Sequence, residues 1–482
     1  MMYLCRPIKE KMAHKYKKRP VLEAIALTGI ADKGKCIGRT AEGAVVFVED
    51  AVPGDVVDVQ VTKKKSGYFE GYAVNWHSKS VDRTVPLCAH FGICGGCKWQ
   101  NLTYAAQLHH KEQVVVDAFR HLAKVGVGEM LPILGCESPW EYRNKLEFTA
   151  SNKVWLTAED LNTGKSNQHD VLGFHRPGAF DKAVDIEHCH LMPAPSNALR
   201  NFIKAKAKEL GMTFFDLKKQ YGMLRTVLFR YTATGELMVN VVFYHDDIAL
   251  RTALLDAILG AFPTVTTLLY CINGKANDTI LDQKIIVWHG VGYVEDKLGD
   301  IRFRIGPKSF FQTNTRQAVT LYDVIVRFAD LQGTENVYDL YTGLGSIALY
   351  LARKCGHVVG IEEIAPAIED AKINAELNGI TNTTFYAGDV KNILTAEFSE
   401  KHGKPDVLIT DPPRAGMHAA VVQMLLQLAA PKLVYVSCNP ATQARDLQLL
   451  SEKYDVAKVQ PVDMFPHTHH IENVALLTLR SV

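Results

Sequence analysis

In residues 301–482, short apolar runs alternate with segments of helical spacing, and this rhythm constrains the fold more than any other feature of the chain. Runs of this length are typical of buried strands. Strands that alternate with helices form a parallel, doubly wound sheet, which binds ligands outside the carboxyl ends of its strands. The sequence therefore predicts an α/β fold with a Rossmann-like domain over residues 301–482. The predicted strands cover residues 337–340, 358–362, 384–386, 407–411 and 433–437.

Glycines or acids follow four successive predicted strands. Residues 339–345 read DLYTGLG, where the glycines allow a tight turn and leave room for a ligand. This is not the GxGxxG pattern, so a dinucleotide is less favoured. Glu362 ends the second strand and can bind ribose hydroxyls, while Asp389 and Asp411 follow the third and fourth. This layout is similar to the common methyltransferase fold; the alternative is a nucleotide-free domain with acids on its loops.

Cys438 follows the last of these strands, and residues 465–472 (FPHTHHIE) place three histidines and Glu472 in one loop. A lone cysteine after a strand is more often a packing residue, and the histidines could also form a zinc site, although further ligands are not evident. Together, a thiolate and a carboxylate are the minimal set for methylating carbon 5 of uracil. The thiolate adds to C6, C5 attacks the methyl group of S-adenosylmethionine, and a base removes the C5 proton.

Three of the ten cysteines, Cys88, Cys94 and Cys97, lie within ten residues of one another. In a cytoplasmic chain, as expected here, such spacing indicates metal binding or catalysis more than disulfides. A fourth thiolate would complete either a [4Fe–4S] cluster or a zinc site, and the spacing alone does not separate the two metals.

The rest of the chain predicts three further parts. Residues 1–20 form a basic tail, which is either a solvated arm or a phosphate contact. Residues 21–80 read as a small β-barrel with a basic, aromatic loop, which binds RNA or braces another domain. Residues 81–300 form an α+β region that contains the cysteines.

The sequence resembles the RNA uracil-C5 methyltransferases, the family of the bacterial 23S ribosomal RNA and tRNA 5-methyluridine enzymes, from about residue 21 onward. The resemblance rests on five motifs in the family's order. They are KSFFQTN at 308–314, DLYTGLG at 339–345, DPPR at 411–414, SCNP at 437–440 and HTHHIE at 467–472.

This resemblance implies roles for individual residues. Cys438 matches the family's nucleophile and Glu472 its base. Thr342 and Ser346 stand where the family commonly has Cys and Asn, which leaves the affinity for the cofactor open. The residues implied to contact S-adenosylmethionine are Gln312, Tyr341, Ser346, Glu362, Asp389 and Asp411.

Residues 21–80 resemble the TRAM domain of the ribosomal members, and the family places the fourth cluster ligand at Cys189. The resemblance thus implies a structural or RNA-positioning [4Fe–4S] cluster on Cys88, Cys94, Cys97 and Cys189. Together, the TRAM-like barrel and the four cysteines favour 23S ribosomal RNA over tRNA as the substrate. A non-catalytic RNA-binding protein is a further alternative, which the retention of Cys438 and Glu472 disfavours. Arg414 after Asp-Pro-Pro, together with Cys438, disfavours an amino-group methyltransferase.

No run approaches the ~18 consecutive apolar residues of a membrane span, and the first twenty residues lack the apolar core of a signal peptide. The sequence therefore predicts a cytoplasmic protein, and we expect a monomer.

Overall fold

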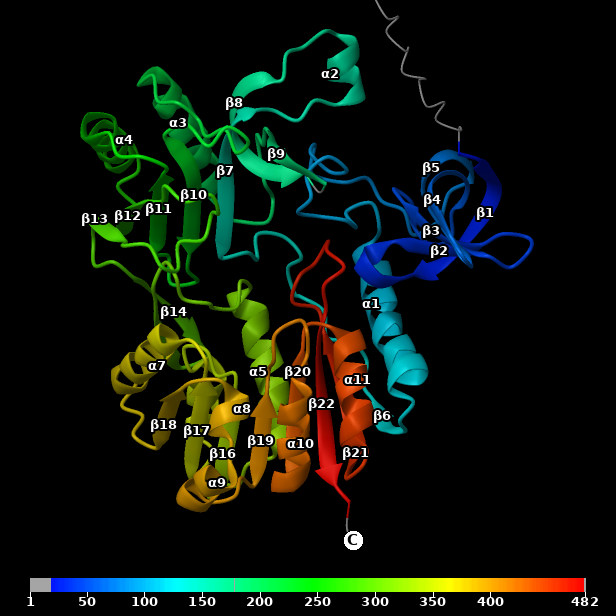
Figure 1. Ribbon diagram of the computed structural model, residues 1–482, viewed down its shortest axis with the longest axis vertical. Helices are drawn as coiled ribbons and strands as arrows, with labels where there is room; N and C mark the ends of the chain where they lie inside the picture. The colour runs from blue at the N-terminus through cyan, green and yellow to red at the C-terminus, as the bar shows by residue number, and fades with distance from the viewer. Residues whose placement is uncertain (1–18, 177, 481–482) are drawn as a thin grey trace, which may run out of the picture. The chain divides into compact units, whose positions relative to one another are not determined.

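The computed structural model describes residues 19–176 and 178–480, in two compact units that divide between Arg83 and Thr84 (Figure 1). Most of the predicted basic tail, residues 1–18, lies outside the described residues. None of the helices in the described ranges has the length and apolar character that a membrane span needs.

The first unit is a closed five-stranded barrel, in which β4 pairs back onto β1. Val57, Val59 and Val61 alternate with outward-facing residues along β4 and are buried, as the period of two in a strand requires. The predicted small barrel is therefore confirmed. Its elements are β1 (Val21–Ile30), η1 (Asp32–Gly34), β2 (Cys36–Arg39), β3 (Val45–Glu49), β4 (Val56–Lys65) and β5 (Tyr68–Ser78).

An eight-stranded sheet organises the carboxyl-terminal half in the order β18-β17-β16-β19-β20-β22-β21-β6. The first five strands are parallel, which confirms the predicted α/β domain. β22 runs antiparallel to both of its neighbours. The strands are β16 (Asn336–Leu340), β17 (His357–Glu362), β18 (Thr383–Ala387), β19 (Val407–Thr410), β20 (Lys432–Ser437), β21 (Tyr454–Val462) and β22 (Glu472–Leu479).

Both faces of this sheet are buried under helices. In β20, Val434 and Val436 belong to one hydrophobic core, whereas Leu433 and Tyr435 belong to the other. Helix starts carry the expected signals: Asn314 caps α5, and Pro440 opens α11. The helices are α5 (Thr315–Ala329), α6 (Ser346–Ala352), α7 (Ala365–Leu377), α8 (Val390–Ile393), α9 (Ala396–His402), α10 (Ala419–Leu428) and α11 (Pro440–Leu450).

The last strand of the sheet comes from far earlier in the chain. β6 (Val127–Met130) pairs in parallel with β21, and α1 (Tyr104–Ala118) with the π-helical turn η2 (Phe119–Ala123) packs on α11 (Figure 1). A segment that the sequence places among residues 81–300 thus completes the sheet of the carboxyl-terminal half.

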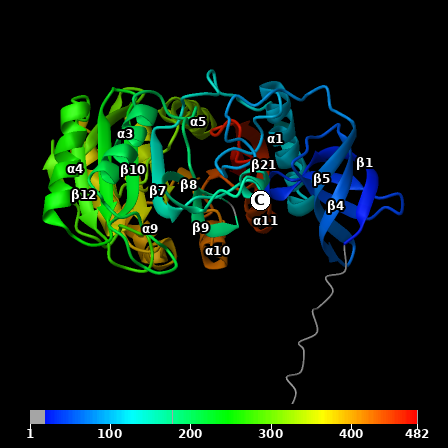
Figure 2. The same cartoon turned by 90° about the horizontal axis from the view of Figure 1, so that it is seen from above.

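A second, seven-stranded sheet has the order β13-β12-β11-β10-β7-β8-β9. Helices α3 and α4 lie side by side and share a hydrophobic core with its central strands (Figure 2). The hairpin of β14 (Val294–Leu298) and β15 (Ile301–Ile305) follows it. The remaining elements are β7 (Lys145–Lys153), α2 (Ala158–Asn162), β8 (Gln168–Arg176), β9 (Ala179–Val184), α3 (Ser196–Glu209), β10 (Leu224–Tyr231), β11 (Leu237–Phe243), α4 (Ile248–Ala261), β12 (Thr267–Ile272) and β13 (Ile286–His289).

Candidate active site

The register of two antiparallel strands brings Cys438 and Glu472 together. Ser437, the last residue of β20, pairs with Asn473 of β22. Cys438 comes directly after Ser437, and Glu472 comes directly before Asn473, so the two residues continue the same ladder side by side. The Cys438 side chain is partly exposed, whereas Glu472 is only 6% exposed.

The thiol of Cys438 lies among acidic groups. Burial raises its pKa to about 11, and the carboxyl groups of Glu472 and Asp411 add to the effect. Arg414 acts in the opposite direction, through its charge and a hydrogen bond. A thiol in this setting is mostly protonated at neutral pH, so Arg414 is the group that favours the reactive thiolate.

Three carboxyl groups near one edge of the sheet influence one another: Asp339 in β16, Asp411 after β19 and Glu472 at the start of β22. Burial raises the pKa of Glu472 well above its usual range, with a further contribution from Asp411. Burial also raises the pKa of Asp411 to about 7, with Asp339 adding to it. Carboxyl groups with raised pKa values can accept or hold a proton near neutral pH, which is the property of a general base.

The turn after β16 fixes the position of Glu362. Gly343 has a φ of 59°, which glycine adopts without strain, and a Cβ at this position would meet nothing within 4 Å. The Gly343 N–H donates to one Glu362 oxygen (3.1 Å), and the Ile364 N–H donates to the other (2.9 Å). Glu362 is thus oriented at the carboxyl end of β17, with lone pairs available for the hydroxyl groups of a ligand.

Tyr341 and Asp389 lie in the same region as Glu362. Burial raises the pKa of Tyr341 to about 12, and Asp389 and Glu362 are among the charges that contribute. Asp389 caps α8 by accepting from the Lys391 N–H (3.1 Å), and a hydrogen bond from the Lys391 side chain lowers its pKa.

The two other residues predicted to contact the cofactor lie on separate elements. The hydroxyl of Ser346, at the start of α6, hydrogen-bonds that of Tyr322 in α5 (2.8 Å). Gln312 is buried in the segment before α5. Its backbone carbonyl group accepts a hydrogen bond from Asn144 Nδ2 (2.8 Å).

Sequence reasoning did not single out Asp339 as a site residue. Asp339 is fully buried; Thr342 Oγ1 donates to its Oδ2, while its Oδ1 has no partner among the described residues. Burial raises its pKa to about 7. The sequence carries a signal for it, because Asp339 opens the DLYTGLG motif near the end of the first predicted strand.

The four cysteines Cys88, Cys94, Cys97 and Cys189 line one cavity of about 390 Å³. The Gly96 N–H donates to Cys94 Sγ (3.4 Å), and burial raises the pKa of the Cys97 thiol to about 12. Within residues 19–176 and 178–480, no three His, Cys, Asp or Glu side chains are grouped so that they could hold a single metal ion. The geometry gathers the predicted ligands around a common space without forming a mononuclear site.

The histidines of the 465–472 loop are held neutral. Burial lowers the pKa of His467 and His469 to about 4 and that of His470 to about 3. The ring of Trp140 stacks on that of His467, with 3.8 Å between the ring centroids. The His467 ring also lies within hydrogen-bond distance of Gln107 Nε2 (3.2 Å), and the rings of His469 and His470 pack against each other, so the three rings are structural groups of the loop that ends at Glu472.

Comparison with known proteins gives matches over almost the whole chain. Residues 201–480 match the family model described as tRNA (Uracil-5-)-methyltransferase, and residues 24–74 match the TRAM domain. Two relatives are each called an uncharacterized RNA methyltransferase. The one from Porphyromonas gingivalis is 52% identical, over 94% of this chain and 98% of the relative. The one from Bacteroides thetaiotaomicron is 51% identical, over 94% of this chain and 100% of the relative.

One similar solved structure also spans both units. The Pyrococcus abyssi tRNA (uracil-54, C5)-methyltransferase, in complex with S-adenosyl-L-homocysteine, aligns with a TM-score of 0.72 and 27% sequence identity. The alignment covers 94% of this chain and 99% of that one.

Proposed function

The chain belongs to the RNA (uracil-5-)-methyltransferase family and depends on S-adenosylmethionine, and from this we propose that it methylates carbon 5 of a uridine in 23S ribosomal RNA, with Cys438 as nucleophile and Glu472 as base. The observation that carries the assignment of these two residues is the pairing of Ser437 with Asn473. With this pairing, the Cys438 thiol and the buried Glu472 carboxyl group lie side by side. This arrangement suits attack at C6 and proton removal at C5 of the same double bond.

The two side chains make and break the RNA bonds other than the new C5–methyl bond, which forms as the donor's S–CH3 bond breaks and S-adenosylhomocysteine is left. The Cys438 thiolate adds to C6, and the electron pair of the C5–C6 double bond makes C5 nucleophilic. S-adenosylmethionine supplies the methyl group that C5 takes up. Glu472 then removes the C5 proton, the double bond re-forms, and the S–C6 bond breaks to return the thiolate. Arg414 lowers the pKa of both Cys438 and Glu472 and so favours the two ionised forms that this sequence needs.

The residues at the strand ends fit the methyl donor. The oriented carboxylate of Glu362 suits the ribose hydroxyls, as an acid at the end of the second strand does in nucleotide-binding sheets. Asp339 and Asp411 have raised pKa values, and the positive charge of S-adenosylmethionine would stabilise their ionised forms. We assign Gln312, Tyr341, Ser346 and Asp389 as further contacts to the donor.

We also propose a [4Fe–4S] cluster on Cys88, Cys94, Cys97 and Cys189. Such a cluster distributes its four thiolates over four iron atoms, whereas zinc gathers them on a single atom. Four cysteines that line one cavity could serve either metal, and the family resemblance favours the cluster. Its four thiolate ligands would leave no iron free to react, so we give it a structural or RNA-positioning role.

The choice of ribosomal RNA rests on the barrel together with the cysteines, the combination that the family resemblance associates with the ribosomal members. A transfer RNA is the second candidate, because the Pyrococcus abyssi protein of similar overall fold is a tRNA (uracil-54, C5)-methyltransferase. Both candidates share the same chemistry at the uracil ring.

RNA that contains 5-fluorouridine tests the nucleophile. Fluorine at C5 cannot leave as a proton, so the adduct with Cys438 should persist through denaturing electrophoresis. We expect this adduct with the wild-type protein and with Cys355→Ala, a change at a buried cysteine of the α6–β17 connection, but not with Cys438→Ala. An equal adduct with Cys438→Ala, or no adduct with a wild-type protein that methylates ordinary RNA, would overturn the assignment.

A further inference from the structure

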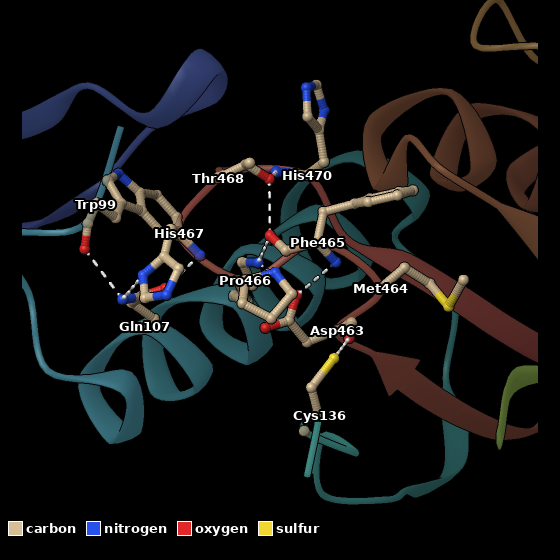
Figure 3. Close-up of polar contacts among 12 residues, drawn as sticks. Trp99, Gln107, Cys136, Asp463, Met464, Phe465, Pro466, His467, Thr468 and His470 are labelled. Atoms are coloured by element: carbon tan, nitrogen blue, oxygen red, sulfur yellow. Dashed lines mark hydrogen bonds and ion pairs between the residues drawn. The ribbon is translucent and has the colours of Figure 1, made fainter. Parts of the chain in front are cut away.

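The loop that leads to Glu472, residues 463–471, is held along its backbone. Figure 3 shows this loop with several of its partners. Five consecutive carbonyl groups, from Asp463 to His467, each accept a hydrogen bond from outside the loop. The donors, in the same order, are Cys136 Sγ (3.0 Å), Asn314 Nδ2 (3.0 Å), Lys111 Nζ (3.0 Å), Tyr142 Oη (3.1 Å), and the N–H groups of Lys98 (2.8 Å) and Trp99 (3.0 Å).

Helix α1 contributes a buried ion pair to this arrangement. Lys111 Nζ lies 2.6 Å from Asp463 Oδ1, and both side chains are fully buried. Tyr104 of the same helix donates to Asp463 Oδ2 (3.0 Å). Desolvation lowers the pKa of Lys111, whereas Asp463 raises it. Because desolvation offsets much of the attraction, a buried ion pair adds little to stability, whereas it does fix the relative positions of its two side chains.

Gln107, one helical turn before Lys111, binds the middle of the loop at His467. Its Oε1 accepts from the His467 N–H (2.8 Å), and its Nε2 donates to the carbonyl groups of Trp99 (3.0 Å) and Leu102 (2.9 Å). Figure 3 shows Gln107 between Trp99 and His467. His467 has a φ of 65°, a left-handed conformation that a non-glycine residue keeps only where its surroundings enforce it.

We propose that Gln107 and Lys111 are positioning residues for proton removal from C5: they fix the 463–471 loop so that Glu472 is held opposite Cys438. The inference rests on the proposed function of Glu472. Pairing with β20 and β21 sets the register of Glu472, but the preceding loop has no regular structure and would otherwise leave the carboxyl group freedom to move within that register. A displacement of about 1 Å can cost on the order of 100-fold in rate. The buried contacts of α1 remove that freedom before the substrate binds.

The variants Gln107→Leu and Lys111→Met test this role with ordinary RNA. Addition of Cys438 and methyl transfer come before proton removal, so a misplaced Glu472 should stall the reaction as a covalent RNA–protein adduct. We expect turnover to fall by roughly 10- to 100-fold and the adduct to accumulate, with the affinity for S-adenosylmethionine unchanged within about twofold. Val115→Ala, which loosens the packing of the same helix but removes no hydrogen bond to the loop, should accumulate no adduct.

Glu472→Gln provides the reference, because it removes the base itself. If Glu472→Gln accumulates the adduct while Gln107→Leu and Lys111→Met turn over like Val115→Ala, the positioning role is wrong and the proposed function stands. If Gln107→Leu loses activity without adduct, the positioning role is also wrong. If Glu472→Gln accumulates no adduct, the assignment of Glu472 as base fails first. Should Lys111→Met not fold, Gln107→Leu decides, since it leaves the buried ion pair intact.

Discussion

Arg414 has a larger influence on the chemistry than its exposed position suggests. The acidic groups around Cys438 oppose thiolate formation, and Arg414 is the cation that counteracts them at both Cys438 and Glu472. Nucleophile and base both need their deprotonated forms, so one guanidinium group supports the two halves of the reaction.

Replacing Arg414 should therefore make Cys438 less reactive. A thiol reacts as its thiolate, so below a pKa of about 11 the alkylation rate rises about tenfold per pH unit. We expect the wild-type rate to keep rising between pH 7 and 9. When the logarithm of the rate is plotted against pH, Arg414→Ala should give a line parallel to that of the wild type but several-fold lower in rate, because the pKa of the thiol rises further. Peptide-resolved mass spectrometry after iodoacetamide treatment measures this rate at Cys438, with Arg353→Ala as the control. A wild-type rate that levels off below pH 8, or an unchanged rate in Arg414→Ala, would contradict this account.

For individual residues, the sequence indicates the reacting pair but not the residues that hold the loop before Glu472. Cys438 and Glu472 could be identified because each lies in a short motif next to a strand end. Gln107 and Lys111 could not be identified, because their partners lie more than 350 positions away and no local pattern records such a contact. From the sequence alone, a polar helix residue that is buried by a distant loop cannot be distinguished from one that is exposed to solvent.

Among the elements, the parallel strands were predictable and β6 was not. The parallel strands are continuous apolar runs because both faces of the sheet are buried. β6 reads Val-Gly-Glu-Met and is only partly buried, so its own sequence carries no strand signal. Its place beside β21 depends on a pairing across more than 300 residues, which local propensity cannot supply.

The cysteine cavity joins two connections that are distant in the sequence, one before α1 and one between β9 and α3. We predict that protein purified without air contains about four iron and four sulfide per chain, and that Cys189→Ala loses most of both. Cys271→Ala, a change at a buried cysteine in β12 outside this cavity, should keep them. Iron, sulfide and zinc analysis provides the measurement, and one zinc per chain without sulfide would contradict the cluster.

For the whole molecule, the sequence predicts the architecture better than the substrate. The barrel, the parallel sheet and the methyltransferase activity agree with the structure and with the relatives. The RNA that is bound depends on the combined surfaces of several parts, and no single motif encodes it. The same overall fold serves a tRNA in the Pyrococcus abyssi protein, so the fold does not decide between the two classes of RNA.

Methyl transfer from labelled S-adenosylmethionine to total RNA from cells that lack this protein tests the central claim most directly. The modified nucleoside would be identified and its position mapped, for the wild-type protein and for Cys438→Ala. The account predicts labelled 5-methyluridine in 23S ribosomal RNA with the wild-type protein and no label with Cys438→Ala. Label in tRNA alone would contradict the proposed substrate, and label in another nucleoside, or equal label with Cys438→Ala, would contradict the mechanism.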